Sequence, residues 1–192
     1  MNMSRVQDII NSRRTIYRFS DQPVSESDLE IGFTAANNAP CHKHTFPWQF
    51  YVLGQETRDK LLDRVVELAH EKAEKKGDVD KDLAGRKAIS KIRDVPVMIA
   101  VTSKLSPDDQ FREQEDYAAT VCSLHNLVLS LWDLGIGSQW STGSITRDSS
   151  TYEHLEIDEQ KERIIGFLKV GYPQMIPEKK TANSDKFKHY LP

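Results

Sequence analysis

Cysteine is scarce in this sequence, with two cysteines, Cys41 and Cys122, among 192 residues. They form no CxxC pair, so nothing supports a disulfide scaffold, and we expect a reducing, cytoplasmic setting. The opening stretch MNMSRVQDIINSRR lacks the apolar core of a secretion signal. The longest apolar run, 95–101, is far shorter than the roughly 20 residues that a membrane helix needs. We therefore expect no membrane partner.

An excess of positive charge is also missing. The formal net charge is -3 at pH 7, which disfavours a general attraction to nucleic acid or to anionic membranes. Hydrophobic residues make up 38% and charged residues 29%, which is typical of a globular domain. The length predicts one domain over residues 1–192.

Several well-known functional motifs are absent or incomplete. The run Gly135–Trp140, GIGSQW, begins like GxGxxG, but its sixth position is tryptophan. It also follows an expected helix and precedes an extended run, the reverse of the dinucleotide-binding context. The sequence contains no P-loop. A nucleotide held in a Rossmann crevice is therefore disfavoured.

The stretch NAPCHKHTFPWQF, residues 38–50, gathers Cys41, His42, Lys43 and His44. His42 and His44 could meet a metal if the segment were a strand, but the other histidines show no paired spacing. Cys41 could be a nucleophile if Lys43 or His42 lowered its pKa, but no third orienting group is identifiable. The metal site and the catalytic thiol are kept as alternatives, but the sequence favours neither.

The periodicity predicts an α+β fold with one central sheet. We expect a short helix at residues 4–12, a helix opened by the capping box Ser27–Glu30, a helix over 56–75 and a largely apolar helix over 110–134. Strands are expected at 48–53, 95–102 and 164–172. The charged stretch 70–92, interrupted by glycines, is interpreted as an excursion or lid, and 173–192 as a C-terminal extension.

A basic loop, RRTIYRF, follows the first expected helix. It places the guanidiniums of Arg13, Arg14 and Arg18 close to the hydroxyl of Thr15. Arginine forks match a phosphate group in two places, and a hydroxyl adds a short donor. One phosphate would suit this cluster, although a solvated basic turn is the simpler alternative.

Four of these segments together resemble the FMN-dependent nitroreductase family, across nearly the whole chain. They are RRTIYRF, APCHKHTFPWQF, GIGSQWSTG and IIGFLKVGYP, in the family's order and at its spacing. The His-Lys pair after Ala-Pro-Cys is closest to the small bacterial YdjA-like subgroup. At His44, Phe46 and Ser141 the sequence departs from residues common in the family.

The resemblance implies a three-layer α/β/α fold with a mixed, mostly antiparallel sheet, in an intertwined homodimer that binds FMN tightly at each interface. It assigns the phosphate to Arg13, Arg14 and Thr15, assisted by Arg18, and suggests added charge from Lys179 or Lys180. Asn38 and His42 would reach the flavin of the partner subunit. The flavin would be lined by Trp140, Ser141 and Thr142, with close backbone approach at Gly143.

The same resemblance implies an enzyme without a catalytic side chain of its own, because the flavin carries the chemistry. NADH or NADPH would give hydride to FMN, and a nitroaromatic, a quinone or another small electrophile would then receive it in a ping-pong cycle. Two alternatives use the same scaffold: a non-catalytic flavin carrier or sensor, and a reductive dehalogenase or C=C reductase.

Overall fold

The structure is a computed structural model that describes residues 5–77, 80–179 and 187–192. Its helices are α1 (Arg5–Ser12), α2 (Glu26–Asn37), α3 (Gln55–Lys60), α4 (Leu62–Lys75), α5 (Lys81–Arg93), α6 (Gln110–Asp133) and α7 (Ser149–Leu155). Its strands are β1 (Trp48–Val52), β2 (Val97–Lys104), β3 (Gly137–Ser141) and β4 (Glu162–Gly171). Two 3-10 turns, η1 (His42–His44) and η2 (Ser144–Arg147), complete it.

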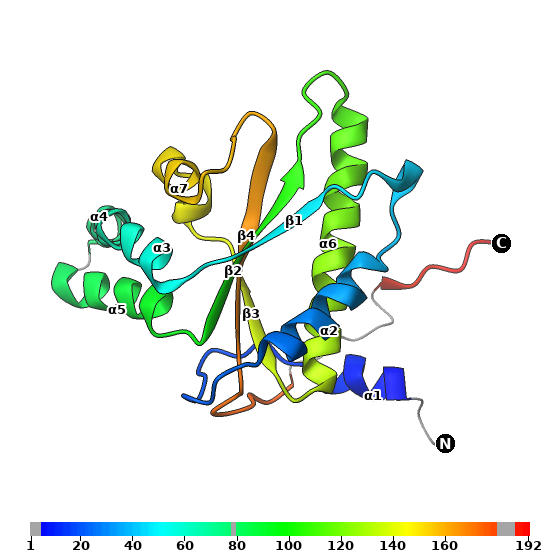
Figure 1. The fold of residues 1–192 in the computed structure, drawn as a ribbon, viewed down its shortest axis with the longest axis horizontal. Helices are drawn as coiled ribbons and strands as arrows, with labels where there is room; N and C mark the ends of the chain where they lie inside the picture. Colours follow the sequence, from blue (N-terminus) through cyan, green and yellow to red (C-terminus); the bar gives the residue numbers. More distant parts are fainter. Residues whose placement is uncertain (1–4, 78–79, 180–186) are drawn as a thin grey trace.

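The four strands form one antiparallel sheet in the order β1-β2-β4-β3 (Figure 1). A bulge between Val101 and Thr102 shifts the register of β2 against β4. The parallel component within the described residues is a single bridge between Thr15 and Ser138. The expected α+β fold is thus confirmed.

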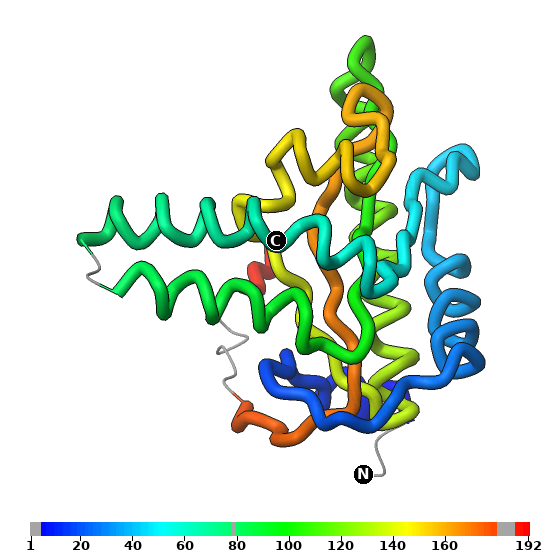
Figure 2. The backbone as a smooth tube through the Cα atoms, turned by 60° about the vertical axis from the view of Figure 1, so that its left-hand side comes forward, coloured from blue at the N-terminus to red at the C-terminus, as the bar shows by residue number. Residues whose placement is uncertain are grey.

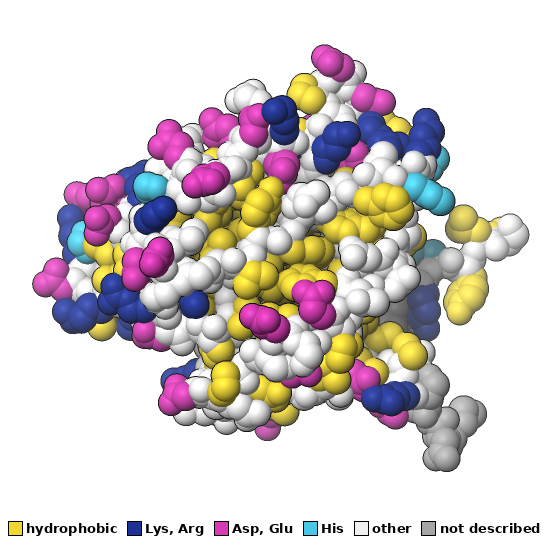
Figure 3. Space-filling model, viewed as in Figure 1, with side chains coloured by type: hydrophobic (Ala, Val, Ile, Leu, Met, Phe, Trp, Pro, Cys, Tyr) yellow, Lys and Arg dark blue, Asp and Glu magenta, His cyan; other side chains and the backbone are white. Residues whose placement is uncertain are grey.

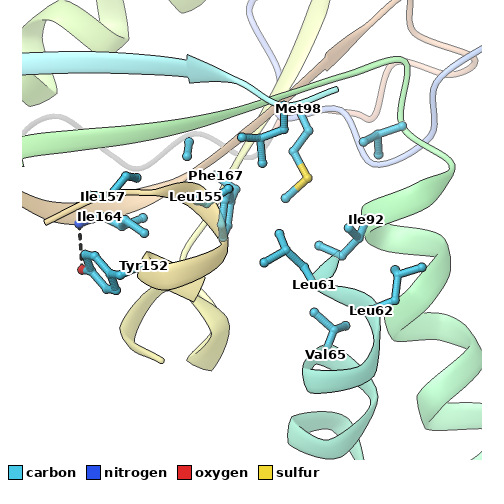
Figure 4. Close-up of a cluster of buried hydrophobic side chains, with 13 residues drawn as sticks. Leu61, Leu62, Val65, Ile92, Met98, Tyr152, Leu155, Ile157, Ile164 and Phe167 are labelled. Atoms are coloured by element: carbon cyan, nitrogen blue, oxygen red, sulfur yellow. Dashed lines mark hydrogen bonds between the residues drawn. The ribbon is translucent and has the colours of Figure 1, made fainter. Parts of the chain in front are cut away.

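Alternating residues of β2 and β4 enter two separate hydrophobic cores, which makes the fold three-layered. Ile99 and Leu168 face α2 and α6, whereas Met98 and Phe167 face α3, α4, α5 and α7. Figure 4 shows the second core, in which Tyr152 of α7 accepts a hydrogen bond from the backbone N–H of Ile164, at 2.9 Å. Strands apolar on both faces are those buried between two helical layers.

The start of α2 differs from the expected capping box. The cap is Ser25, whose hydroxyl accepts from the Asp28 N–H at 3.1 Å, so the helix begins at Glu26. Both Ser25 and Ser27 have side chains suited to an N-cap, and the helix begins after the first of them.

The helix expected over 56–75 is divided, with α3 ending and α4 beginning on either side of Leu61. In the charged stretch that follows, Gly85 does not interrupt α5 but lies buried inside it. A Cβ at this position would come within 3.0 Å of His70 Nε2, so glycine allows close packing of α5 on α4. The short helix α7 had no counterpart among the expected elements.

Helices α4 and α5 form an antiparallel hairpin that projects from the body of the molecule (Figure 2). It coincides with most of the charged stretch 70–92. A role as a lid stays a prediction. Within residues 5–77, 80–179 and 187–192, no helix is long and apolar enough to cross a membrane.

Candidate functional site

A cleft of about 580 Å³ lies between the α4–α5 hairpin and the β3–β4 side of the sheet. Its walls come from the facing sides of α4 and α5, from the loop at 143–145 and from the sheet. Of the residues expected to line the flavin, Ser141 and Gly143 lie on this cleft. The structure therefore places two of the predicted site residues on a cavity large enough for a small ligand.

The cleft is strongly cationic, although the chain as a whole is acidic. One acidic residue, Asp80, lines it, and the opposing ammonium groups are those of Lys72, Lys76, Lys87, Lys91 and Lys169. Within the described part of the chain, no hydrogen bond or ion pair joins the ammonium group of any of these five lysines to a partner. Asp80 itself caps α5 by accepting from the Leu83 N–H at 2.8 Å. The cleft thus presents uncompensated positive charge to any ligand.

Lys169 is the deepest of these lysines, with 5% of its surface exposed. It lies in β4 opposite Gln139 of β3 and Met98 of β2, on the same face of the sheet as Phe167. Burial and, to a smaller extent, the positive charge of Lys91 together lower the pKa of its ammonium to about 8. The sequence pattern gave no signal for this lysine, because it stands within an apolar strand and becomes part of a site only when β3 and α5 are packed beside it.

The basic loop is hydrogen-bonded to β3, the strand that leads to the cleft. Thr15 bridges to Ser138, and the Ile16 N–H donates to the Ser138 carbonyl at 2.9 Å. Arg14 is partly committed to structure, since its Nη1 donates at 2.7–2.9 Å to three carbonyls in residues 11–13. Its Nε is buried without a hydrogen-bond partner among the described residues.

Arg13 and Lys179 add charge around this loop. The guanidinium of Arg13 lies near His125 of α6, whose pKa is lowered first by partial desolvation and then by that positive charge. Lys179 Nζ donates to the Asn11 side-chain oxygen at 3.5 Å, which places Lys179 beside the end of α1, just before the basic loop. Lys180, expected to contribute here, falls outside the described residues. Arg18 is exposed, and its carbonyl accepts from the Gln174 N–H at 3.0 Å.

Trp140 lies beside the cleft but does not line it. Its indole N–H donates to the Ile165 carbonyl at 3.2 Å, and Ser141 Oγ donates to the Phe167 carbonyl at 3.4 Å. Thr142 is exposed in the turn that follows. The turn is therefore anchored to β4, and the flavin contacts assigned to it stay predictions.

His42 and the basic loop lie near opposite ends of α6, because Arg112 at the start of that helix contacts His42, whereas Trp132 near its end contacts Ser12, just before the loop. Asn38 directly follows α2, whose last turn is bonded to the middle of α6 by Ser123. Asn38 donates from its side chain to the Thr34 carbonyl at 2.8 Å, and the His42 carbonyl accepts from Arg112 at 3.4 Å. The side chains of both residues are exposed. A single chain does not bring them to the basic loop.

Cys41 is engaged with its own loop. Its sulfur accepts from the Phe46 N–H at 3.2 Å and lies 3.1 Å from the Thr45 hydroxyl, which in turn donates to the buried Asp116 at 2.7 Å. Among the described residues, no group of three or more His, Cys, Asp and Glu side chains is placed to hold a metal ion.

Comparison with known proteins gives one consistent result. A model of the nitroreductase family matches residues 10–172. YfhC of Bacillus subtilis (strain 168), a candidate NAD(P)H nitroreductase, is 31% identical over 187 residues, which cover 96% of this chain and 93% of YfhC. YdjA of Escherichia coli (strain K12), another candidate NAD(P)H nitroreductase, is 27% identical over 88% of both chains.

Solved structures agree with the architecture. A nitroreductase-like family protein from Bacillus cereus superposes with a TM-score of 0.81 at 27% identity, covering 100% of this chain and 98% of that one. A candidate nitroreductase from Desulfovibrio desulfuricans, solved with FMN, has a TM-score of 0.77 at 19% identity and covers 100% and 99%. The second likeness shows the fold alone. From the extent of the family match and the YfhC similarity, this chain belongs to the nitroreductase family.

Proposed function

We propose that this chain is an FMN-dependent oxidoreductase that passes hydride from NADH or NADPH to a small electrophilic acceptor such as a nitroaromatic or a quinone. The observation that carries the proposal is the arrangement along β3. The basic loop is bonded to its first half at Ser138, and the cationic cleft opens beside its second half at Gln139 and Ser141. FMN has a phosphate at one end and a planar ring at the other, so the arrangement fits both parts.

The donor set fits the group. Arg13 and Thr15 would hold the phosphate, with Lys179 as an added cation, because charged N–H and hydroxyl donors bind phosphate oxygens strongly. Gly143 lies on the cleft with no Cβ, and this would let the backbone approach a flat ring closely. FMN, when bound, supplies the hydride chemistry, and the protein binds it, orients it and leaves one face open. Relatives described as NAD(P)H nitroreductases, and the FMN in the Desulfovibrio protein, support this assignment.

We also propose that the active form is a homodimer with the cofactor at the interface. His42 is separated from the basic loop of its own chain by most of the length of α6 between Arg112 and Trp132, about 30 Å, so a partner chain would supply His42 together with Asn38. Helix α6 carries an exposed face that includes Tyr117, Cys122 and His125. An exposed helix face can form the self-complementary contact of a symmetric dimer.

The open edge of the sheet points to the same assembly. Val52 of β1 is 52% exposed, and Ile31 of α2 is 50% exposed. Figure 3 shows apolar side chains gathered in the middle of this face, between more charged regions. Exposed apolar surface beside an unpaired strand edge is typical of an interface.

The test is to purify the protein and identify its pigment. We expect a yellow protein that releases FMN, that bleaches anaerobically with NADH or NADPH, and that regains colour when menadione or p-nitrobenzoate is added. A colourless chain that FMN does not stabilise would refute the proposal. Bound flavin that neither nucleotide bleaches would instead indicate a carrier or sensor. Sedimentation equilibrium should give a mass of two chains.

A further inference from the structure

We propose that Lys169, in the sheet at the floor of the cleft, and Lys91, on its α5 wall, form an anion-binding subsite that takes a planar group bearing negative charge on oxygen or nitrogen. The inference rests on the proposed function, because two parts of that chemistry could occupy the subsite. One is the anionic edge of the reduced flavin, and the other is a carboxylate carried by the acceptor.

The first step of the argument is the burial of Lys169 without a partner. An ammonium taken out of water is costly unless a negative group or several acceptors replace the lost hydration. Lys169 is 5% exposed, yet no carboxylate or carbonyl within the described residues accepts a hydrogen bond from its ammonium. The pKa of about 8, lowered by burial and by Lys91, reports the same lack of compensation.

Arg58, a second buried cation on the same side of the sheet, has a structural role and serves as a comparison for Lys169. Arg58 is 8% exposed, and its Nη1 donates to the Val95 carbonyl at 2.7 Å, which fixes α3 to the segment before β2. Lys169 makes no such bond in the described part of the chain. Its charge is therefore better explained by a ligand than by the fold.

The surroundings of Lys169 fit a hydrogen-bonding anion. Gln139 lies opposite it in β3 and also lines the cleft, as does Ser141 two residues further on. The Gln139 amide N–H₂ can donate to an anionic atom that the ammonium attracts, whereas the Ser141 hydroxyl already donates to the Phe167 carbonyl. Phe167 lies on the same face of β4 and lines the cleft, and an aromatic neighbour suits a flat ligand.

The charge distribution favours an anion over a cation or a neutral ligand. Lys91 lines the same cleft from α5, and its positive charge acts directly on Lys169. Two ammonium groups that repel each other lower their joint energy when one negative group lies between them. Asp80, the acidic lining residue, is at the far end of α5 from Lys91 and is already used as its cap.

The experiment compares wild type with Lys169→Met and Lys169→Arg. Methionine keeps the length and the packing of the side chain without charge, and arginine keeps the charge. Lys161→Met is the matched control, because Lys161 is an exposed lysine paired with Asp158 at 2.9 Å outside the cleft. Benzoate, a planar carboxylate, is titrated calorimetrically into each protein, FMN-free and FMN-loaded. The affinities for oxidised and reduced FMN are measured in parallel.

If an acceptor carboxylate occupies the subsite, Lys169→Met should weaken benzoate binding to the FMN-loaded protein at least tenfold. If the reduced flavin occupies it, Lys169→Met should instead lower the ratio of reduced-FMN to oxidised-FMN affinity at least tenfold. In both cases Lys169→Arg should retain most of the effect, and Lys161→Met should change nothing beyond twofold.

The subsite is overturned if Lys169→Met stays within twofold of wild type for benzoate and for both flavin states. A large loss of stability in FMN-free Lys169→Met would also overturn it, because an unpaired buried charge should not stabilise the fold. If wild type binds no FMN at all, the proposed function fails separately. The benzoate comparison on the FMN-free proteins then decides the subsite by itself.

Discussion

The indole of Trp140 lies directly over Gly166 of the neighbouring strand. A Cβ at position 166 would come within 2.1 Å of the indole nitrogen, closer than any real contact. The indole N–H donates to the adjacent Ile165 carbonyl at 3.2 Å. The missing side chain of Gly166 thus makes room for the Trp140 ring, just before the turn that borders the cleft.

Gly166→Ala should destabilise the protein by about 1–3 kcal/mol, because the ring must leave its place or β4 must shift. Urea unfolding of the FMN-free protein measures the change. In a Trp140→Ala background the clash is gone, so the same substitution should cost much less. Equal costs in both backgrounds would show that the indole is not what excludes a side chain at 166.

Tyr152→Phe should cost about 1–2 kcal/mol of unfolding free energy, because it leaves the buried Ile164 N–H without its acceptor. The ring itself stays packed between α7 and the sheet, so the substitution isolates the hydroxyl. Tyr17→Phe is the matched control, since Tyr17 is 69% exposed. Thermal unfolding of the two variants should separate them, and similar melting temperatures would exclude a stabilising role for the Tyr152 hydroxyl.

Arg13→Ala should weaken FMN binding by about 1.5–3 kcal/mol, the usual scale for a charge-assisted hydrogen bond. Quenching of flavin fluorescence on binding measures the dissociation constant. Arg5→Ala is a suitable control, because Arg5 is on the adjacent helix and pairs with Asp133 at 2.7 Å on the surface. Unchanged FMN affinity in Arg13→Ala would reject its phosphate role.

The same Arg13→Ala variant should raise the pKa of His125 toward its ordinary value of 6.5. Arg13 disfavours the charged imidazolium, so its removal relieves part of the depression, while the partial desolvation remains. A histidine NMR titration of the FMN-free protein measures this. A pKa that does not rise would mean that the guanidinium and the ring are further apart in solution.

Lys169 should make stability increase with pH in the weakly alkaline range. Below about pH 8 its ammonium is charged in the folded and the unfolded chain, and the folded chain bears the cost of burial. Between about 8 and the ordinary value of 10.5, the unfolded chain keeps a proton that the folded chain has released, so rising pH favours folding.

The difference in unfolding free energy between wild type and Lys169→Met isolates this effect from other titrating groups. It should shift in favour of wild type by about 1–3 kcal/mol between pH 7 and pH 10, given roughly 1.4 kcal/mol per unit of pKa depression. Chemical denaturation at each pH measures it. A difference that does not depend on pH would show that the Lys169 ammonium is hydrated.

Much of the fold followed from local pattern. Residues 95–102 and 164–172 are apolar and β-rich, and the structure places β2 and β4 within two residues of those bounds. The long apolar helix ends one residue from its expected end, at Asp133. The apolar composition of β2, β4 and α6 is enough to predict that these elements are buried. The cap of α2 and the short helix α7 do not, because each depends on which of several similar residues finds a partner.

The sequence by itself determined the two-sided apolar strands, the basic loop and the family motifs, since each is a property of neighbouring residues. Only the tertiary structure decided which residues line the cleft. Lys169 looks like an interruption in an apolar strand until the fold pairs it with Gln139 and brings Lys91 of α5 to the same cleft. His42 and the basic loop belong to the same set of family motifs, but in space they lie near opposite ends of α6, beside Arg112 and Trp132 respectively. A charge becomes a binding site only when the fold removes water from it and leaves no partner in its place.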